Sequence, residues 1–245
     1  MQILGRTLVL ITLTCILAFH TASGSGLDEG WGEIQTDNYA NRTLRYQYVI
    51  PGSLPPGARP SVLVTVGGLS SPGPLTKEMR RFARERGMVI VAPWFIWDER
   101  NWAGRTSYQY PEAWSGRALL DIVADLEKER GLKVGSFYMF GFSAGAQFVL
   151  RFALWRPDRC AAVSGHASGG AVTPDRYVNV SFRLTVGSLD TSRARIVSGF
   201  ADLARTYGIR CETQVYEGMG HELAPRVIGD TLSFFKKEIN FDRGL

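Results

Sequence analysis

Short apolar runs alternate with amphipathic stretches along most of the 245-residue chain. The run at 61–66 is β-branched, 74–86 has helical periodicity, and 88–92 is apolar again, which is the order strand, helix, strand. The same order repeats further along the chain. Expected strands are 45–50, 61–66, 88–92, 137–140, 161–164, 182–186 and 211–216, and expected helices are 74–86, 115–130, 144–155, 195–207 and 225–239. Repeated units with wholly apolar strands predict an α/β fold, in which helices cover both faces of a mostly parallel sheet.

The N-terminus differs from the rest of the chain. Arg6 precedes an apolar run from Leu8 to Phe19, and small residues follow at 22–24. This pattern predicts a signal peptide over 1–24 and a secreted or periplasmic protein. No segment reaches the roughly 20 apolar residues that a membrane span needs. The remainder, 25–245, has no change of composition that would separate two folding units, so we expect one domain.

The pentapeptide Gly141-Phe142-Ser143-Ala144-Gly145 matches the pattern G-x-S-x-G. It lies between an expected strand and an expected helix, which is the context that this pattern requires. A serine at such a sharp turn holds its hydroxyl outward, and flanking glycines avoid clashes there. Ser143 is therefore the predicted nucleophile, and a glycine-rich turn with a capping serine is the alternative.

A serine hydroxyl needs a base within hydrogen-bond reach, because it is a weak nucleophile at neutral pH. Beyond the predicted signal peptide the chain has two histidines, His166 and His221. His221 follows the last expected strand, so the chain order serine, aspartate, histidine makes it the expected base. Asp190 comes one βα unit earlier and is the carboxylate expected to orient it. A helix cap or turn is the alternative role of Asp190.

A tetrahedral intermediate on Ser143 would need two backbone N–H donors for its oxyanion. One is expected from Ala144, directly after the nucleophile. The other is expected from the loop after the strand at 61–66, where Gly68 and Leu69 lie.

The loop after the strand at 88–92 is rich in aromatic residues. Because it follows a strand, we expect it on the same side as Ser143, where flat rings would contact an acyl chain, an aromatic acid or a sugar. The residues expected to bind substrate are Trp94, Trp97, Trp102, Tyr108 and Trp114, together with His166 from the loop after another strand. The alternatives are packing of these rings onto the domain and an ordinary polar loop position for His166.

The motifs Gly-Phe-Ser143-Ala-Gly, Gly-Ser-Leu-Asp190 and Gly-Met-Gly-His221, in that order, resemble those of the α/β-hydrolase superfamily over about 45–239. Within it the chain is similar to small secreted esterases such as polyhydroxybutyrate depolymerases and feruloyl esterases. The resemblance implies an α/β-hydrolase fold and cleavage of carboxylic esters through an acyl-enzyme, with no metal or organic cofactor. The segment at 165–179, where many lipases insert a helical lid, is short, which predicts minimal or no cap. One departure is that many such esterases have a His-Gly pair after the third strand, whereas this chain has Val66-Gly67-Gly68-Leu69.

Two other functions stay open at this stage. The same triad cleaves amides and peptides, since pocket shape alone separates these substrates from esters, and a noncatalytic protein of this fold would use the aromatic loop to hold a ligand. The expected partner is a small or polymeric ester. Nucleic acid is not an expected partner because the net charge of +5 is spread along the chain, and the sequence does not indicate an oligomeric state. Cys160 and Cys211 precede strands that are not expected to be neighbours, which leaves a bridge between them open.

Overall fold

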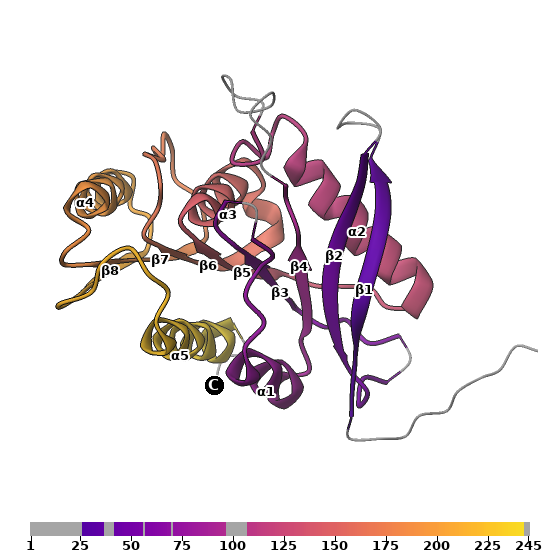
Figure 1. Cartoon of the computed structure of the whole chain (residues 1–245). Coiled ribbons are helices and arrows are strands. Elements are labelled where there is room, and N and C mark those ends of the chain that lie inside the picture. The colour runs from indigo at the N-terminus through magenta and orange to yellow at the C-terminus, as the bar shows by residue number, and fades with distance from the viewer. Residues whose placement is uncertain (1–25, 37–41, 56, 70, 97–106, 243–245) are drawn as a thin grey trace, which may run out of the picture.

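The computed structural model describes residues 26–36, 42–55, 57–69, 71–96 and 107–242. The described chain forms one eight-stranded sheet in the order β1-β2-β4-β3-β5-β6-β7-β8, with helices packed against it (Figure 1). The strands are β1 (Leu27–Thr36), β2 (Arg42–Pro51), β3 (Val62–Val66), β4 (Val89–Pro93), β5 (Phe137–Phe142), β6 (Cys160–His166), β7 (Ser181–Gly187) and β8 (Cys211–Tyr216). The helices are α1 (Lys77–Arg86), α2 (Ser115–Arg130), α3 (Ala144–Trp155), α4 (Thr191–Thr206) and α5 (Pro225–Asp242), with a short 3₁₀ turn at Pro157–Arg159.

The six strands β3 to β8 all run parallel to one another, which confirms the predicted mostly parallel sheet. At one edge β1 and β2 form an antiparallel hairpin, and β2 pairs antiparallel with β4. β1 has no counterpart in the sequence prediction. Its segment contains two glycines and three acidic residues, which are depleted in strands, and pairing along the whole of β2 holds it in place.

Helices cover both faces of the sheet, as predicted (Figure 1). Along β5, Phe137 and Met139 belong to the apolar core shared with α2, α3 and α4. The alternate residues, Tyr138 and Phe140, belong to the core shared with α1 and α5. Since successive side chains of a strand point to opposite faces, a strand between two helical layers must be apolar throughout, which explains its uninterrupted apolar sequence.

The carboxyl ends of the parallel strands meet at one edge of the sheet, where α/β folds place their functional groups. The connection from β6 to β7, residues 167–180, contains no helix, so no cap rises over this edge from that connection. Cys160 and Cys211 are free thiols on β6 and β8, which are separated by β7. In the part of the chain that the structure describes, no helix is both long and apolar enough to cross a bilayer.

Candidate active site

Ser143 lies between β5 and α3 with φ 57° and ψ −115°, a backbone conformation that residues other than glycine rarely adopt. Backbone hydrogen bonds hold it there. Its N–H donates to the carbonyl oxygen of His166 at 2.9 Å, and its own carbonyl oxygen accepts from Ala146 at 3.1 Å and Gly169 at 3.2 Å. A Cβ on Gly145 would overlap the backbone at the end of β3, so only glycine allows α3 to approach this closely. The turn therefore holds the hydroxyl outward.

His221 and Asp190 complete a chain of hydrogen bonds to this serine. Nε2 of His221 is 3.0 Å from Oγ of Ser143, and its Nδ1 is 2.8 Å from Oδ2 of Asp190. An ionised carboxylate only accepts, so Nδ1 carries the hydrogen and Nε2 is free to take the proton of the serine hydroxyl. The structure thus brings together three residues that lie 78 and 31 positions apart in the sequence.

The surroundings of the three side chains differ. The side chain of His221 is 34% exposed, whereas that of Asp190 is 4% exposed. Burial by itself would raise the pKa of Asp190, but hydrogen bonds from Arg193 and His221 outweigh burial and lower that pKa below its ordinary value. Arg193, on the first turn of α4, donates to Oδ1 of Asp190 at 3.0 Å. Asp190 is therefore held as a buried anion that faces an accessible histidine.

The residues predicted for the oxyanion lie next to the nucleophile. Ala144 is the first residue of α3, so its N–H has no acceptor within the helix. Gly68 packs against Ser143, because a Cβ on this glycine would lie 3.6 Å from the serine Cβ. Leu69 follows with an exposed side chain. The backbone at Gly68 thus lies beside the serine.

The predicted substrate-binding aromatic residues that the structure describes pack at two separate places. Tyr108 and Trp114 are buried core residues that pack against the ring of Phe95, at centroid distances of 5.3 and 5.8 Å. Trp94 lies beside Trp31 of the β1–β2 hairpin, at 5.9 Å. Trp97 and Trp102 lie outside the described residues. For the described rings, packing of the loop onto the domain is the arrangement found.

His166 also differs from its expected place on a substrate pocket. It is the last residue of β6 and is fully buried. Its Nδ1 is 2.8 Å from the Thr185 hydroxyl, and its Nε2 is 2.8 Å from the carbonyl oxygen of Glu222. The ring of Phe142 stacks on the ring of His166 and on the ring of His221, nearly parallel to both. His166 is therefore a buried residue next to the Ser143 turn and not an exposed one.

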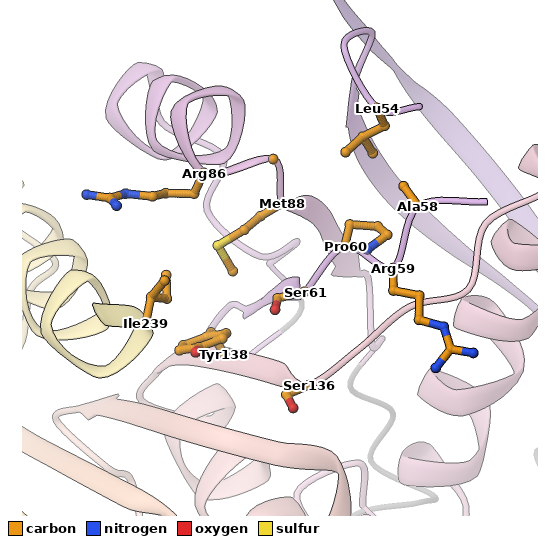
Figure 2. Close-up of a pocket in the computed structure, with 11 residues that line it drawn as sticks. Leu54, Ala58, Arg59, Pro60, Ser61, Arg86, Met88, Ser136, Tyr138 and Ile239 are labelled. Atoms are coloured by element: carbon orange, nitrogen blue, oxygen red, sulfur yellow. The ribbon is translucent and has the colours of Figure 1, made fainter. Parts of the chain in front are cut away.

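A cavity of about 340 Å³ lies at the opposite edge of the sheet, below the starts of β3 and β5 (Figure 2). Ser61 and Ser136 border it. In Figure 2 the guanidinium groups of Arg59 and Arg86 point away from the ring of Tyr138, so charged groups do not converge on the cavity. The described residues that line this cavity do not form a hydrogen-bonded series like that of Ser143, His221 and Asp190.

Sequence reasoning missed Arg193 and Phe142, which contact Asp190 and His221, and Thr185, which contacts His166. The contact of Arg193 could have been found, because an aspartate followed three positions later by an arginine at the start of a helix predicts an ion pair. Phe142 lies within the predicted motif, but its pattern does not specify which rings lie beside it. In the described ranges, no three His, Cys, Asp or Glu side chains gather in a way that could hold a metal ion.

Comparison with known proteins gives structural relatives alone. No protein-family model and no curated protein matches the sequence. A ferulic acid esterase is similar with a TM-score of 0.65 and 14% identity, over 87% of this chain and 96% of the other. An S-formylglutathione hydrolase from Agrobacterium tumefaciens has a TM-score of 0.67 and 16% identity, over 88% and 96%. A poly(3-hydroxybutyrate) depolymerase from Bordetella parapertussis has a TM-score of 0.56 and 20% identity, over 91% of each. This chain has the α/β-hydrolase fold.

Proposed function

We propose that this protein is a secreted serine hydrolase that cleaves carboxylic esters through an acyl-enzyme. Ser143 attacks the ester carbonyl carbon while His221 takes the hydroxyl proton at Nε2. His221 then gives this proton to the leaving alcohol, and Asp190 stabilises the imidazolium through Nδ1. In the second half a water molecule repeats the attack on the acyl group, with His221 again as base, which releases the acid and restores the serine.

The observation that carries this proposal is the continuous pair of hydrogen bonds, 3.0 Å from serine to histidine and 2.8 Å from histidine to aspartate. The strained backbone of Ser143 adds to it, because such strain costs about 1–3 kcal/mol and persists where the surroundings enforce it. Backbone N–H groups of Ala144 and of the Gly68–Leu69 segment are the proposed oxyanion donors. Their position beside Ser143 is compatible with this role.

The proposed substrate has an apolar acyl group. Leu69 and Leu189 are exposed by 49% and 69%, although leucine is ordinarily buried. Leu69 follows the oxyanion segment and Leu189 precedes Asp190, so both lie at the carboxyl edge close to the triad. With no cap from the connection at 167–180, a soluble or polymeric ester can reach the serine. The names of the structural relatives, which include a ferulic acid esterase and a poly(3-hydroxybutyrate) depolymerase, agree with such substrates.

Secretion is proposed from the sequence of residues 1–24, which precede the described residues. Expression of the full chain with a periplasmic or culture-medium assay would test it directly. We expect the released protein to begin near residue 25, as determined by N-terminal sequencing. An intact N-terminus in the released protein would contradict the proposed cleavage.

The enzyme proposal is tested with p-nitrophenyl esters of increasing acyl length and methyl ferulate, alongside a fluorophosphonate probe. We expect turnover and labelling by wild type and neither by Ser143→Ala. The matched control is Ser233→Ala, which removes an exposed hydroxyl on α5 and should leave both unchanged. Labelling without ester turnover would favour an amide or peptide hydrolase instead. A folded wild-type protein with neither activity would refute a serine hydrolase and favour a noncatalytic ligand-binding protein.

A further inference from the structure

His166 is a fully buried titratable residue to which the proposed mechanism gives no role. Both ring nitrogens have partners, and one partner fixes the tautomer. The carbonyl oxygen of Glu222 can only accept, so Nε2 of His166 carries a hydrogen and donates it. Nδ1 then accepts from the hydroxyl of Thr185. Burial lowers the pKa of His166, which keeps this ring neutral at pH 7.

The contacts of His166 extend to all three segments that carry the triad. Its backbone oxygen accepts from the N–H of Ser143 at 2.9 Å. Its Nδ1 meets Thr185 on β7, the strand that leads to Asp190. Its Nε2 holds the carbonyl of the residue that directly follows His221. A single residue thus connects the turn after β5, strand β7 and the loop after β8.

Ring packing links the same residue to the base. Phe142 stacks on both histidine rings, at centroid distances of 5.8 Å from His166 and 5.0 Å from His221. From β8 the ring of Tyr216 meets His166 edge-on at 5.9 Å. A shift of the His166 ring would therefore be passed to His221 both through Phe142 and through the backbone at Glu222.

We infer that His166 is a positioning residue: its neutral ring, with the hydrogen on Nε2, fixes the loop of His221 relative to Ser143 and Asp190. This inference rests on the proposed function for its effect on rate. The geometry of the loop follows from the same contacts whether or not the protein is an enzyme. His166 does not touch the reacting atoms.

Two substitutions at this position separate the hydrogen bond from ring packing. His166→Phe keeps an aromatic ring beside Phe142 and removes both ring nitrogens, whereas His166→Gln keeps an N–H donor within reach of Glu222. Because a misplacement of about 1 Å can cost about 100-fold in rate, we expect kcat of His166→Phe to fall about 10- to 100-fold. We expect KM to stay within about twofold of wild type, and His166→Gln to recover most of the lost kcat.

The matched control is Ser164→Ala. Ser164 is buried two positions earlier on β6, and its hydroxyl is 3.0 Å from that of Thr231 on α5. This hydrogen bond does not involve the segments that carry Asp190 and His221. This variant should lower the thermal midpoint without lowering kcat. A purely structural role for His166 would give the same pattern in His166→Phe, a lower midpoint with an unchanged kcat.

Hydrogen exchange gives a readout that needs no turnover. We expect faster amide exchange over 217–224 in His166→Phe than in wild type, and near wild-type exchange in His166→Gln and Ser143→Ala. If wild type shows no turnover but this exchange pattern is found, the proposed function fails and the positioning role stands. Equal kcat values in His166→Phe and wild type, no rescue by glutamine, or unchanged exchange would each overturn the inference.

The inference can also be tested on wild-type protein alone, which covers the case that His166→Phe does not fold. Nitrogen-15 spectra of the imidazole rings at pH 7 should show His166 neutral, with its proton on Nε2. A proton on Nδ1 instead, or a doubly protonated ring, would overturn the assignment of donor and acceptor and with it the inference.

Discussion

The substitution Asp190→Asn should abolish most of the activity, and Arg193 determines how severe the loss is. An asparagine at this position presents one oxygen and one NH₂ group to two neighbours, His221 and Arg193, which both donate to the carboxylate. With its oxygen toward Arg193, the NH₂ faces Nδ1 of His221 and forces the proton onto Nε2. The histidine then points a hydrogen at Ser143 and cannot act as base, a tautomer error that costs about 10⁴-fold in kcat.

The opposite orientation of asparagine would rescue the correct tautomer, but it turns NH₂ toward the guanidinium of Arg193. That orientation gives up a hydrogen bond to a charged donor, which is worth about 1.5–3 kcal/mol. At about 1.4 kcal/mol per factor of ten, the productive orientation is populated about 10- to 100-fold less than the other. Removal of the Arg193 guanidinium should therefore restore the population of the productive orientation by about the same factor.

We therefore expect Asp190→Asn/Arg193→Met to be about 10- to 100-fold more active than Asp190→Asn. Methionine keeps much of the arginine stem, and the buried Nε of Arg193 has no hydrogen-bond partner in the described part of the chain, so the substitution removes the bond to Asp190 and little else. Arg193→Met alone should lose less than about tenfold. Steady-state kcat on a p-nitrophenyl ester measures all three variants. A double variant no more active than Asp190→Asn would refute this account of Arg193.

Three further predictions concern packing, substrate and pH. Gly145→Ala should lower the free energy of unfolding by about 1–3 kcal/mol or more in urea titrations, because its methyl group would overlap the backbone of β3. Leu189→Ser should raise KM in proportion to acyl length, with butyrate to octanoate esters as the test and acetate as the control, since a contact to each buried methylene is worth up to about 0.8 kcal/mol. The buried His166 has a lowered pKa, so the unfolded chain takes up this proton first as pH falls below about 6.5, and the free energy of unfolding should decline by at most about 1.4 kcal/mol per pH unit. His166→Gln should remove this decline between pH 6.5 and 5 and leave the loss below about pH 4, where the lowered pKa of Asp190 ceases to contribute; an unchanged decline would assign it to other groups.

The fold could be predicted from the sequence because most of its strands are buried between helices. Such strands must be apolar on both sides, and this requirement leaves runs such as β3 and β7 visible without any knowledge of their neighbours. β1 has no second layer that demands apolar residues and is held by its pairing with β2. Its sequence therefore carries little strand signal, although it forms a long ladder.

The proximity of Ser143, Asp190 and His221 could be expected from the sequence because the chemistry of the proposed triad restricts each member to few residue types, and each follows a strand. The aromatic loop could not be assigned in the same way. The direction of each described ring depends on packing, as in the contacts of Tyr108 and Trp114 with Phe95 of the same loop, and the sequence pattern does not specify such contacts. A ring that could line a pocket and a ring that fills a core have the same sequence pattern.

His166 shows how burial can separate a structural position from a functional one. A neutral imidazole in the core loses its hydrogen bonds to water, a cost that is offset when both nitrogens find partners. Its two partners lie 19 and 56 positions away, on segments that also lead to Asp190 and follow His221. An apolar residue at the end of β6 would fill the same space without needing those partners. A histidine at this position is therefore explained by the segments that its hydrogen bonds connect. For this reason we expect its substitution to lower kcat more than it lowers the free energy of unfolding.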